Sequence, residues 1–243
     1  TMNTMISQLN TEEVNVVTLE DPVEYNIDGV NQVQINEKTG MDFANGLRAI
    51  LRQDPDIIAV GEIRDGETAQ ISMRAAITGH VVLSTIHTND AVGTIERLED
   101  IGVEPYLIAT ALRAVISQRL VRRICPKCKK SYEATDEEVR RLGLSTEHKH
   151  IFYRGEGCAD CFNTGYRGRI GVFEILEITP EIRPLISQQA GRPVIEQELA
   201  SAHSEFKTLR ENAIQLVEEG ITTTEEVQRV IYETGDMKKA EEE

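Results

Sequence analysis

Two groups of acidic side chains follow apolar runs in the first part of the chain. Glu62 comes after the run IIAV at residues 57–60 and a glycine, whereas Glu20 and Asp21 come after the run VNVVTL at residues 14–19. A carboxylate in such a place can hold a water molecule or a hydrated Mg²⁺ beside a phosphate. The simpler interpretation is a buried strand that ends in a solvated acid, and each motif by itself leaves both interpretations open.

Basic side chains near Glu62 could absorb the charge that develops when a nucleoside triphosphate is hydrolysed. The candidates are Arg48, Arg52 and Arg64. His87 follows a further apolar run at residues 80–86, where it could hydrogen-bond a γ-phosphate. His80 begins that run, so we expect it at the opposite edge of the sheet and interpret it as structural. Surface arginines and lone histidines are commonly only solvated, and this alternative stays open.

Four cysteines occur as two CxxC pairs, a spacing typical of zinc sites. The ligands would be Cys125, Cys128, Cys158 and Cys161. Two pairs of thiolates complete a tetrahedral site, which leaves no open position for a substrate, so we assign it no catalysis. The 29 residues between the pairs require a long loop or a small subdomain. A redox pair is the alternative, but two matched pairs favour structural zinc.

The elements that must position these groups alternate between strand and helix. Strands are predicted at residues 14–19, 32–35, 57–60 and 80–86, the second of them at an edge and the others in the core. Helices are predicted at residues 1–9, 43–52 with Asp42 as its cap, 66–77, 91–101 and 105–114. This alternation predicts a parallel, doubly wound α/β sheet whose strands have their carboxyl ends at one edge. We expect Glu20, Glu62 and His87 to meet there.

The remaining chain predicts two further strands, at residues 116–124 and 166–176, and a short helix at 136–142. From Pro180 the pattern is helical, with caps at Ser204, Thr208 or Thr224. We therefore expect four segments. They are an α/β core at residues 1–124, a tetracysteine zinc-binding subdomain at 125–165, a strand and helical subdomain at 166–237, and a disordered acidic tail at 238–243.

The composition excludes several classes of function. The net charge is −15, which argues against a whole-surface affinity for nucleic acid. No apolar run reaches the roughly 18 residues of a membrane-spanning helix. The chain is 40% hydrophobic and 28% charged, which is ordinary for a globular protein.

Several motifs in fixed order resemble the ATPases of type II secretion and type IV pilus assembly. They are LEDPVEY at residues 19–25, LRQDPDIIAVGEIRD at 51–65, TGHVVLSTIHTNDA at 78–91, the tetracysteine pairs and TGYRGRIGVFEIL at 164–176. The resemblance covers about residues 1–235. It implies an incomplete RecA-like P-loop ATPase core that binds ATP and Mg²⁺ between the subunits of a homo-hexamer. Such a motor is cytoplasmic and peripheral at the inner membrane, where it works on a membrane platform protein.

The resemblance also implies roles for individual residues. Glu62 would polarise the attacking water, Glu20 and Asp21 would place water and Mg²⁺, and His87 would sense the γ-phosphate. Phosphate contacts or sensors between subunits would be Arg48, Arg64 and Arg169. The tetracysteine element favours the secretion and pilus-extension branches, because the retraction branch usually lacks it.

One departure from the family pattern concerns the phosphates. The motif GxxxxGK[ST], whose backbone amides and lysine cradle the β- and γ-phosphates, is absent, and we expect it just before Thr1. The chain by itself should therefore hydrolyse little or no ATP. Two other interpretations remain: a zinc-stabilised oligomerisation or docking module without ATPase activity, and a RecA-like motor that works on nucleic acid.

Overall fold

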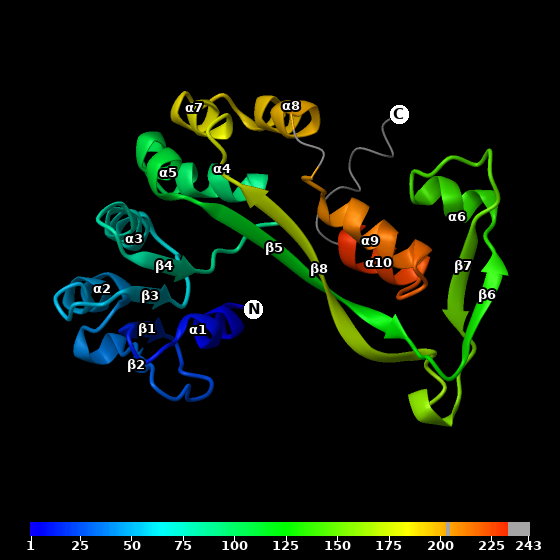
Figure 1. Ribbon diagram of the computed structural model, residues 1–243, viewed down its shortest axis with the longest axis horizontal. Helices are drawn as coiled ribbons and strands as arrows, with labels where there is room; N and C mark the ends of the chain where they lie inside the picture. Colours follow the sequence, from blue (N-terminus) through cyan, green and yellow to red (C-terminus); the bar gives the residue numbers. More distant parts are fainter. Residues whose placement is uncertain (203–204, 233–243) are drawn as a thin grey trace. The chain divides into compact units, whose positions relative to one another are not determined.

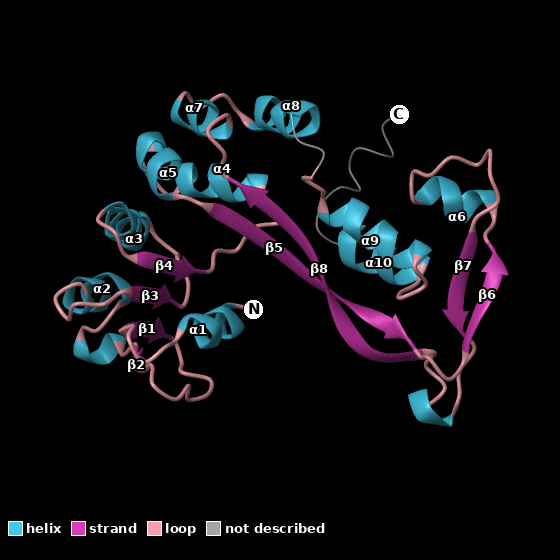
Figure 2. Cartoon of the chain, in the orientation of Figure 1, coloured by secondary structure: helices cyan, strands magenta, loops and turns pink. Residues whose placement is uncertain are grey.

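A computed structural model describes residues 1–202 and 205–232, and the chain divides into two compact units (Figures 1 and 2). The first unit comprises Thr1–Thr88, Val92–Ala114 and Glu177–Glu198. The second comprises Asn89–Ala91, Val115–Leu176 and the described residues that follow the first unit. The four segments expected from the sequence stay a prediction, and the expected tail at 238–243 lies outside the described residues.

The first unit contains a four-stranded sheet in the order β2-β1-β3-β4. The strands are β1 (Val16–Glu20), β2 (Asn31–Gln34), β3 (Ile57–Val60) and β4 (Val81–Ser84). Every pairing is parallel, so all four carboxyl ends point the same way (Figure 2). The parallel α/β fold predicted from the sequence is confirmed, and β2 is an edge strand as expected.

Successive side chains of a strand point to opposite sides, so the apolar strands make both faces of this sheet hydrophobic. Helices cover both faces. One face packs against α2 (Phe43–Ile50) and α3 (Gly66–Ile77), and the other packs against α1 (Met2–Leu9). The first cluster includes Leu19, Leu47, Ile58 and Ala75, and the second includes Ile6, Val16 and Ala59. All four residues of β3 are buried, which confirms the strand predicted from its continuous apolar run.

The prediction that residues 80–86 form a core strand is wrong. β4 is shorter and lies at the sheet edge, and Val81 is 48% exposed. No strand in the described part of the chain pairs with its outer edge. An apolar run looks the same in a central strand and in an edge strand, so the sequence could not separate them.

The remaining elements of the first unit are short helices. They are η1 (Glu37–Thr39), α4 (Val92–Asp100), α5 (Pro105–Ala111), α7 (Ile182–Ser187) and the start of α8 (Arg192–Ala202). Asp42 caps α2 as predicted, because its side chain accepts a hydrogen bond from the Asn45 amide. The chain returns to this unit after β8, where the Ile178 amide donates to the Arg113 carbonyl at 2.9 Å and α7 packs against α5.

The described part of the second unit contains two pairs of strands, three whole α-helices, the short 3-10 helix η2 (Ala159–Cys161) and the end of α8. β5 (Ala114–Ile124) pairs with β8 (Tyr166–Glu177), and β6 (Lys129–Glu133) pairs antiparallel with β7 (Ile151–Gly155). The helices are α6 (Asp136–Arg141), α9 (Leu209–Glu218) and α10 (Thr224–Tyr232). Their shared core includes Val121, Phe152, Val172, Ala213 and Val217. The strands and the short helix predicted for this part of the chain are thus confirmed.

The N-caps of the last helices agree with the sequence only in part. Thr208 caps α9 in a reciprocal box with Glu211, as predicted. At α10 the hydroxyl of Thr223 accepts a hydrogen bond of 3.2 Å from the Glu226 amide. The predicted cap, Thr224, is therefore wrong by one residue. Thr223 and Thr224 carry the same hydroxyl group, so the sequence alone does not show which of them caps the helix. The cap is Thr223 because the helix begins at Thr224. Ser204 lies outside the described residues.

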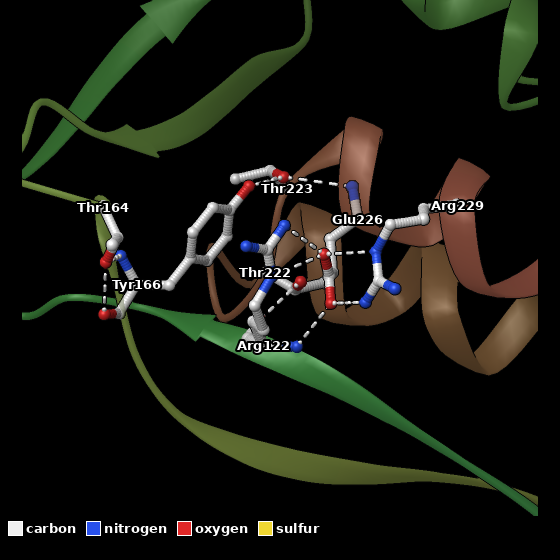
Figure 3. A network of polar contacts seen from close by, with 7 residues as sticks. All are labelled: Arg122, Thr164, Tyr166, Thr222, Thr223, Glu226 and Arg229. Atoms are coloured by element: carbon white, nitrogen blue, oxygen red, sulfur yellow. Dashed lines mark hydrogen bonds and ion pairs between the residues drawn. The ribbon is translucent and has the colours of Figure 1, made fainter.

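A buried carboxylate fastens α10 to β5 (Figure 3). Glu226 is fully buried and accepts hydrogen bonds from the backbone amide of Arg122 at 2.9 Å and from its Nε at 2.8 Å. Arg229 adds a bond of 2.7 Å, and the Arg122 guanidinium lies 4.1 Å from the centre of the Tyr166 ring. Although burial opposes the charge, the hydrogen bonds from both arginines lower the pKa of Glu226 to about 2.

We predict that Glu226→Gln lowers the free energy of unfolding at neutral pH by about 3 kcal/mol, because it removes the buried negative charge to which Arg122 and Arg229 both donate. The folded pKa is depressed, so this stabilisation is present above the ordinary pKa of 4.5 and is lost as the pH falls through about 2. Urea unfolding of both proteins between pH 7 and pH 2 measures this. The difference should close at the acid end, and a constant difference would contradict the assignment.

Candidate functional site

A cleft of about 300 Å³ lies at the carboxyl end of the parallel sheet in the first unit. Its acidic side chains come from the last residue of β1, from the turn that follows it, and from the residue that follows Gly61 after β3. The lining residues are Met2, Asn3, Glu20, Asp21, Pro22, Glu24, Phe43, Gly61, Glu62, Thr85 and His87. The structure therefore brings together four of the residues singled out in the sequence: Glu20, Asp21, Glu62 and His87.

Glu62 has a basic partner at each carboxylate oxygen. Arg64 hydrogen-bonds one oxygen, and Nε2 of His87 lies 3.3 Å from the other. The hydrogen bond from Arg64 is the main cause that holds the pKa of Glu62 below its ordinary value. Glu62 is therefore ionised at neutral pH and is a weak proton acceptor. The His87 side chain is 92% exposed, so it is accessible to a ligand in the cleft.

The backbone around Glu62 is fixed by hydrogen bonds to both neighbouring strands. The Gly61 amide donates to the Leu19 carbonyl at 2.7 Å, and the Ile63 amide donates to the Thr85 carbonyl at 2.8 Å. The hydroxyl of Thr85 returns a bond of 2.7 Å to the Gly61 carbonyl. A Cβ at position 61 would lie only 3.0 Å from the Leu19 oxygen, which explains the glycine at this close approach.

Glu20 is held in place by two residues that the sequence reasoning missed. Its Oε1 accepts hydrogen bonds from Thr18 Oγ1 at 2.6 Å and from Gln32 Nε2 at 2.8 Å, and the residue is only 8% exposed. Thr18 lies two residues before Glu20, on the same side of β1, and pairs in register with Gln32. This spacing was a readable signal for Thr18, whereas Gln32 required the register of two strands. Asp21 is exposed beside Glu20.

The arginines are distributed more widely. Arg64 contacts Glu62, but Arg48 on α2 forms an ion pair with Glu67 on α3 and does not line the cleft. Arg169 is exposed on β8 of the second unit. Of Arg48 and Arg64, which both lie in the first unit, the structure thus brings Arg64 to the acidic side chains of the cleft. His80 has a structural contact as expected, since its Nδ1 lies 3.0 Å from the Ala75 carbonyl oxygen.

The four cysteines of the second unit form one cluster. All four sulfur atoms lie within 4.8 Å of one another, and none takes part in a disulfide. The separations are 3.9 Å for Cys125–Cys158, 3.8 Å for Cys128–Cys161 and 3.7 Å for Cys158–Cys161. A tetrahedral zinc with Zn–S bonds of about 2.3 Å requires S···S edges of about 3.8 Å. The donor set and its dimensions therefore fit a Cys₄ zinc site.

Backbone contacts close the base of this cluster. The Cys125 amide donates to the Gly165 carbonyl at 2.9 Å, and a Cβ at Gly155 would lie 2.1 Å from the same oxygen. Burial raises the pKa of Cys128 to about 12. At Cys161 burial is outweighed by hydrogen bonds, above all from the Cys158 amide, and its pKa falls to about 6. Binding of a metal would have to displace protons from the more basic thiols.

Comparison with known protein families tests the family resemblance found in the sequence. A family model described as "Type II/IV secretion system protein" matches residues 1–229. This chain belongs to that family. The type II secretion system ATPase E of Vibrio cholerae is 46% identical over 229 residues, which cover 94% of this chain and 45% of that protein. The type IV pilus assembly ATPase PilB of Thermus thermophilus is 49% identical over 225 residues, which cover 92% of this chain and 25% of that protein.

Solved structures agree with this assignment. The pilus retraction motor PilT with bound ADP superimposes with a TM-score of 0.69 at 29% identity, over 100% of this chain and 59% of that one. The Legionella pneumophila ATPase DotB, at 23% identity and a TM-score of 0.64, shares the fold. The family resemblance and the ATPase fold class predicted from the sequence are thus confirmed. The chain spans less than half the length of each of these two relatives. Among the described residues, no helix is long and apolar enough to cross a membrane.

We predict that this secretion-family protein, purified without chelator, contains about one zinc ion per chain. Cys158→Ser should remove most of the metal and lower the unfolding temperature, because the site loses one of its four ligands. Ser131→Ala, an exposed substitution on β6 of the same unit, should change neither quantity. Metal analysis of the three proteins measures this, and a wild-type protein without zinc would refute the Cys₄ assignment.

Proposed function

We propose that the whole protein is an ATP-hydrolysing motor for type II protein secretion or type IV pilus assembly, and that this chain supplies the side chains that place the attacking water. The observation that carries the proposal is Glu62, ionised in the cleft that Asp21 and His87 also line. The two relatives, a secretion ATPase and a pilus assembly ATPase, support the two alternatives equally.

The depressed pKa of Glu62 defines its part in the reaction. A carboxylate with a lowered pKa is a poorer proton acceptor, so Glu62 acts by accepting a hydrogen bond from the water and orienting it toward the γ-phosphate. Arg64 keeps the carboxylate charged, and His87 contacts the γ-phosphate. Glu20 and Asp21 would hold water molecules of a hydrated Mg²⁺, which would supply positive charge to the phosphates.

The remaining parts of the proposed site lie on other segments. Backbone amides and a lysine outside this chain cradle the phosphates, and nucleotide binds between the subunits of a homo-hexamer. Arg48, Arg64 and Arg169 serve as phosphate contacts or as sensors between subunits. The motor acts in the cytoplasm on a platform protein of the inner membrane and reaches the membrane only through protein partners. A zinc ion bound by the four cysteines would hold their segments of the second unit together.

A second candidate is a zinc-stabilised oligomerisation or docking module without its own ATPase activity. The closed cysteine cluster supports it, because a Cys₄ site is built for structure. A motor acting on nucleic acid fits less well with the net charge of −15.

We predict that Glu62→Gln in the full-length protein leaves ATP affinity within about threefold and lowers kcat by at least about 100-fold, because the neutral amide orients water poorly. Glu104→Gln, an exposed substitution in the same unit, is the matched control and should change neither. Turnover assays and equilibrium binding of ATP separate the two effects. Unchanged turnover in the Glu62 variant would remove this residue from the reaction.

We predict that residues 1–243 alone bind ATP weakly and show little or no turnover, because the phosphate-cradling segment is missing. The full-length protein assayed in parallel should hydrolyse ATP. Saturable turnover by the isolated chain would contradict the prediction, whereas an inactive full-length protein would favour the docking module.

A further inference from the structure

Glu174 is a buried acid for which the reaction described above gives no role. It lies on β8 and is only 4% exposed. One carboxylate oxygen accepts the Ala91 amide at 2.7 Å, and the other accepts the Leu209 amide at 2.9 Å. One side chain therefore joins the segment before α4 to the first residue of α9, although these positions are 83 and 35 residues away along the sequence.

The Ala91 segment is the direct continuation of the loop that carries His87. The chain passes from the first unit into the second between Thr88 and Asn89. There the Asn89 carbonyl accepts a hydrogen bond of 3.1 Å from Arg119 on β5. Two and four residues after His87, the backbone is thus anchored by side chains of the β5–β8 strand pair.

The Glu174 carboxylate can hold two backbone segments in fixed positions, because each of its oxygens accepts one backbone amide. Hydrogen bonds from amides to a buried carboxylate are charge-assisted and are about twice as strong as neutral ones. A glutamine offers one carbonyl oxygen, so it can satisfy one of the two amides but not both. Movement of either segment would break a bond inside the protein, where no water replaces it.

We propose that Glu174 is a positioning residue that fixes the backbone behind His87 and ties it to the start of α9. The inference rests on the proposed function, in which His87 contacts the γ-phosphate. When that contact is lost on hydrolysis, any shift of the His87 loop is transmitted through Glu174 to β8 and to the N-terminal turn of α9. The C-terminal helices thereby respond to the state of the nucleotide.

The test compares two buried glutamates of the second unit in the full-length protein. Glu174→Gln should lower kcat about tenfold with the KM for ATP within about threefold, because the substrate still binds but the His87 loop is misplaced. Glu226→Gln, which touches no part of that loop, should lower the unfolding temperature while kcat per folded protein stays within about twofold. Equal kcat in the two variants overturns the proposal.

Hydrogen exchange gives a second readout that does not need turnover. The peptide spanning residues 87–92 should exchange faster in Glu174→Gln, with and without a non-hydrolysable ATP analogue, and should be unchanged in Glu226→Gln. If both variants resemble the wild type, Glu174 anchors nothing. If the wild type lacks ATPase activity, the proposed function fails, whereas the exchange result still decides whether Glu174 fixes the loop.

A milder variant covers the case in which Glu174→Gln does not fold. Arg119→Gln removes the partly exposed donor to the Asn89 carbonyl and leaves the buried core intact. It should lower kcat about threefold and speed exchange in the same peptide. Unchanged kcat and unchanged exchange in this variant overturn the proposal.

Discussion

The parallel pairing of β3 with both of its neighbours is the constraint on which the candidate site depends. It brings the ends of β1, β3 and β4 to one edge, where three loops that are distant in sequence face a single cleft. The backbone bonds from Gly61 and Ile63 continue this pairing past the strand ends. A carboxylate that must hold a water within a few tenths of an ångström needs such support, since a free loop would spread it over many positions.

The second unit is held together by a different kind of interaction. Two-stranded ribbons have little apolar area to bury, and such structures need additional fastenings. Here three polar centres supply them: the cysteine cluster and the carboxylates of Glu174 and Glu226. Each joins segments that are far apart in the sequence, and each would be costly to break in the interior. These polar centres therefore add specific links to the hydrophobic core that the strands and helices of this unit share.

The sequence predicted the structure best where a residue pattern is compatible with a single kind of local structure. The continuous apolar run of β3 and the paired CxxC spacing belong to this class. It was less informative where the partner lies on another element. The hydrogen bond from Gln32 to Glu20 depends on strand register, and the edge position of β4 depends on the order of the sheet. Glu174 could have been recognised from the sequence, because it alternates with Val172 and Leu176 on the buried side of β8. A buried acid is stable there only when it accepts hydrogen bonds.

The hydrogen bond between the Cys125 amide and the Gly165 carbonyl has a consequence for the evolution of the chain. The chain enters and leaves the β6–β7 hairpin at practically the same point, so the hairpin is attached to the β5–β8 pair like a side branch. Lengthening or shortening such a branch costs little closure entropy and leaves the base unchanged. The loops of this branch that lie outside the shared core can thus change in length while the β5–β8 pair keeps its geometry.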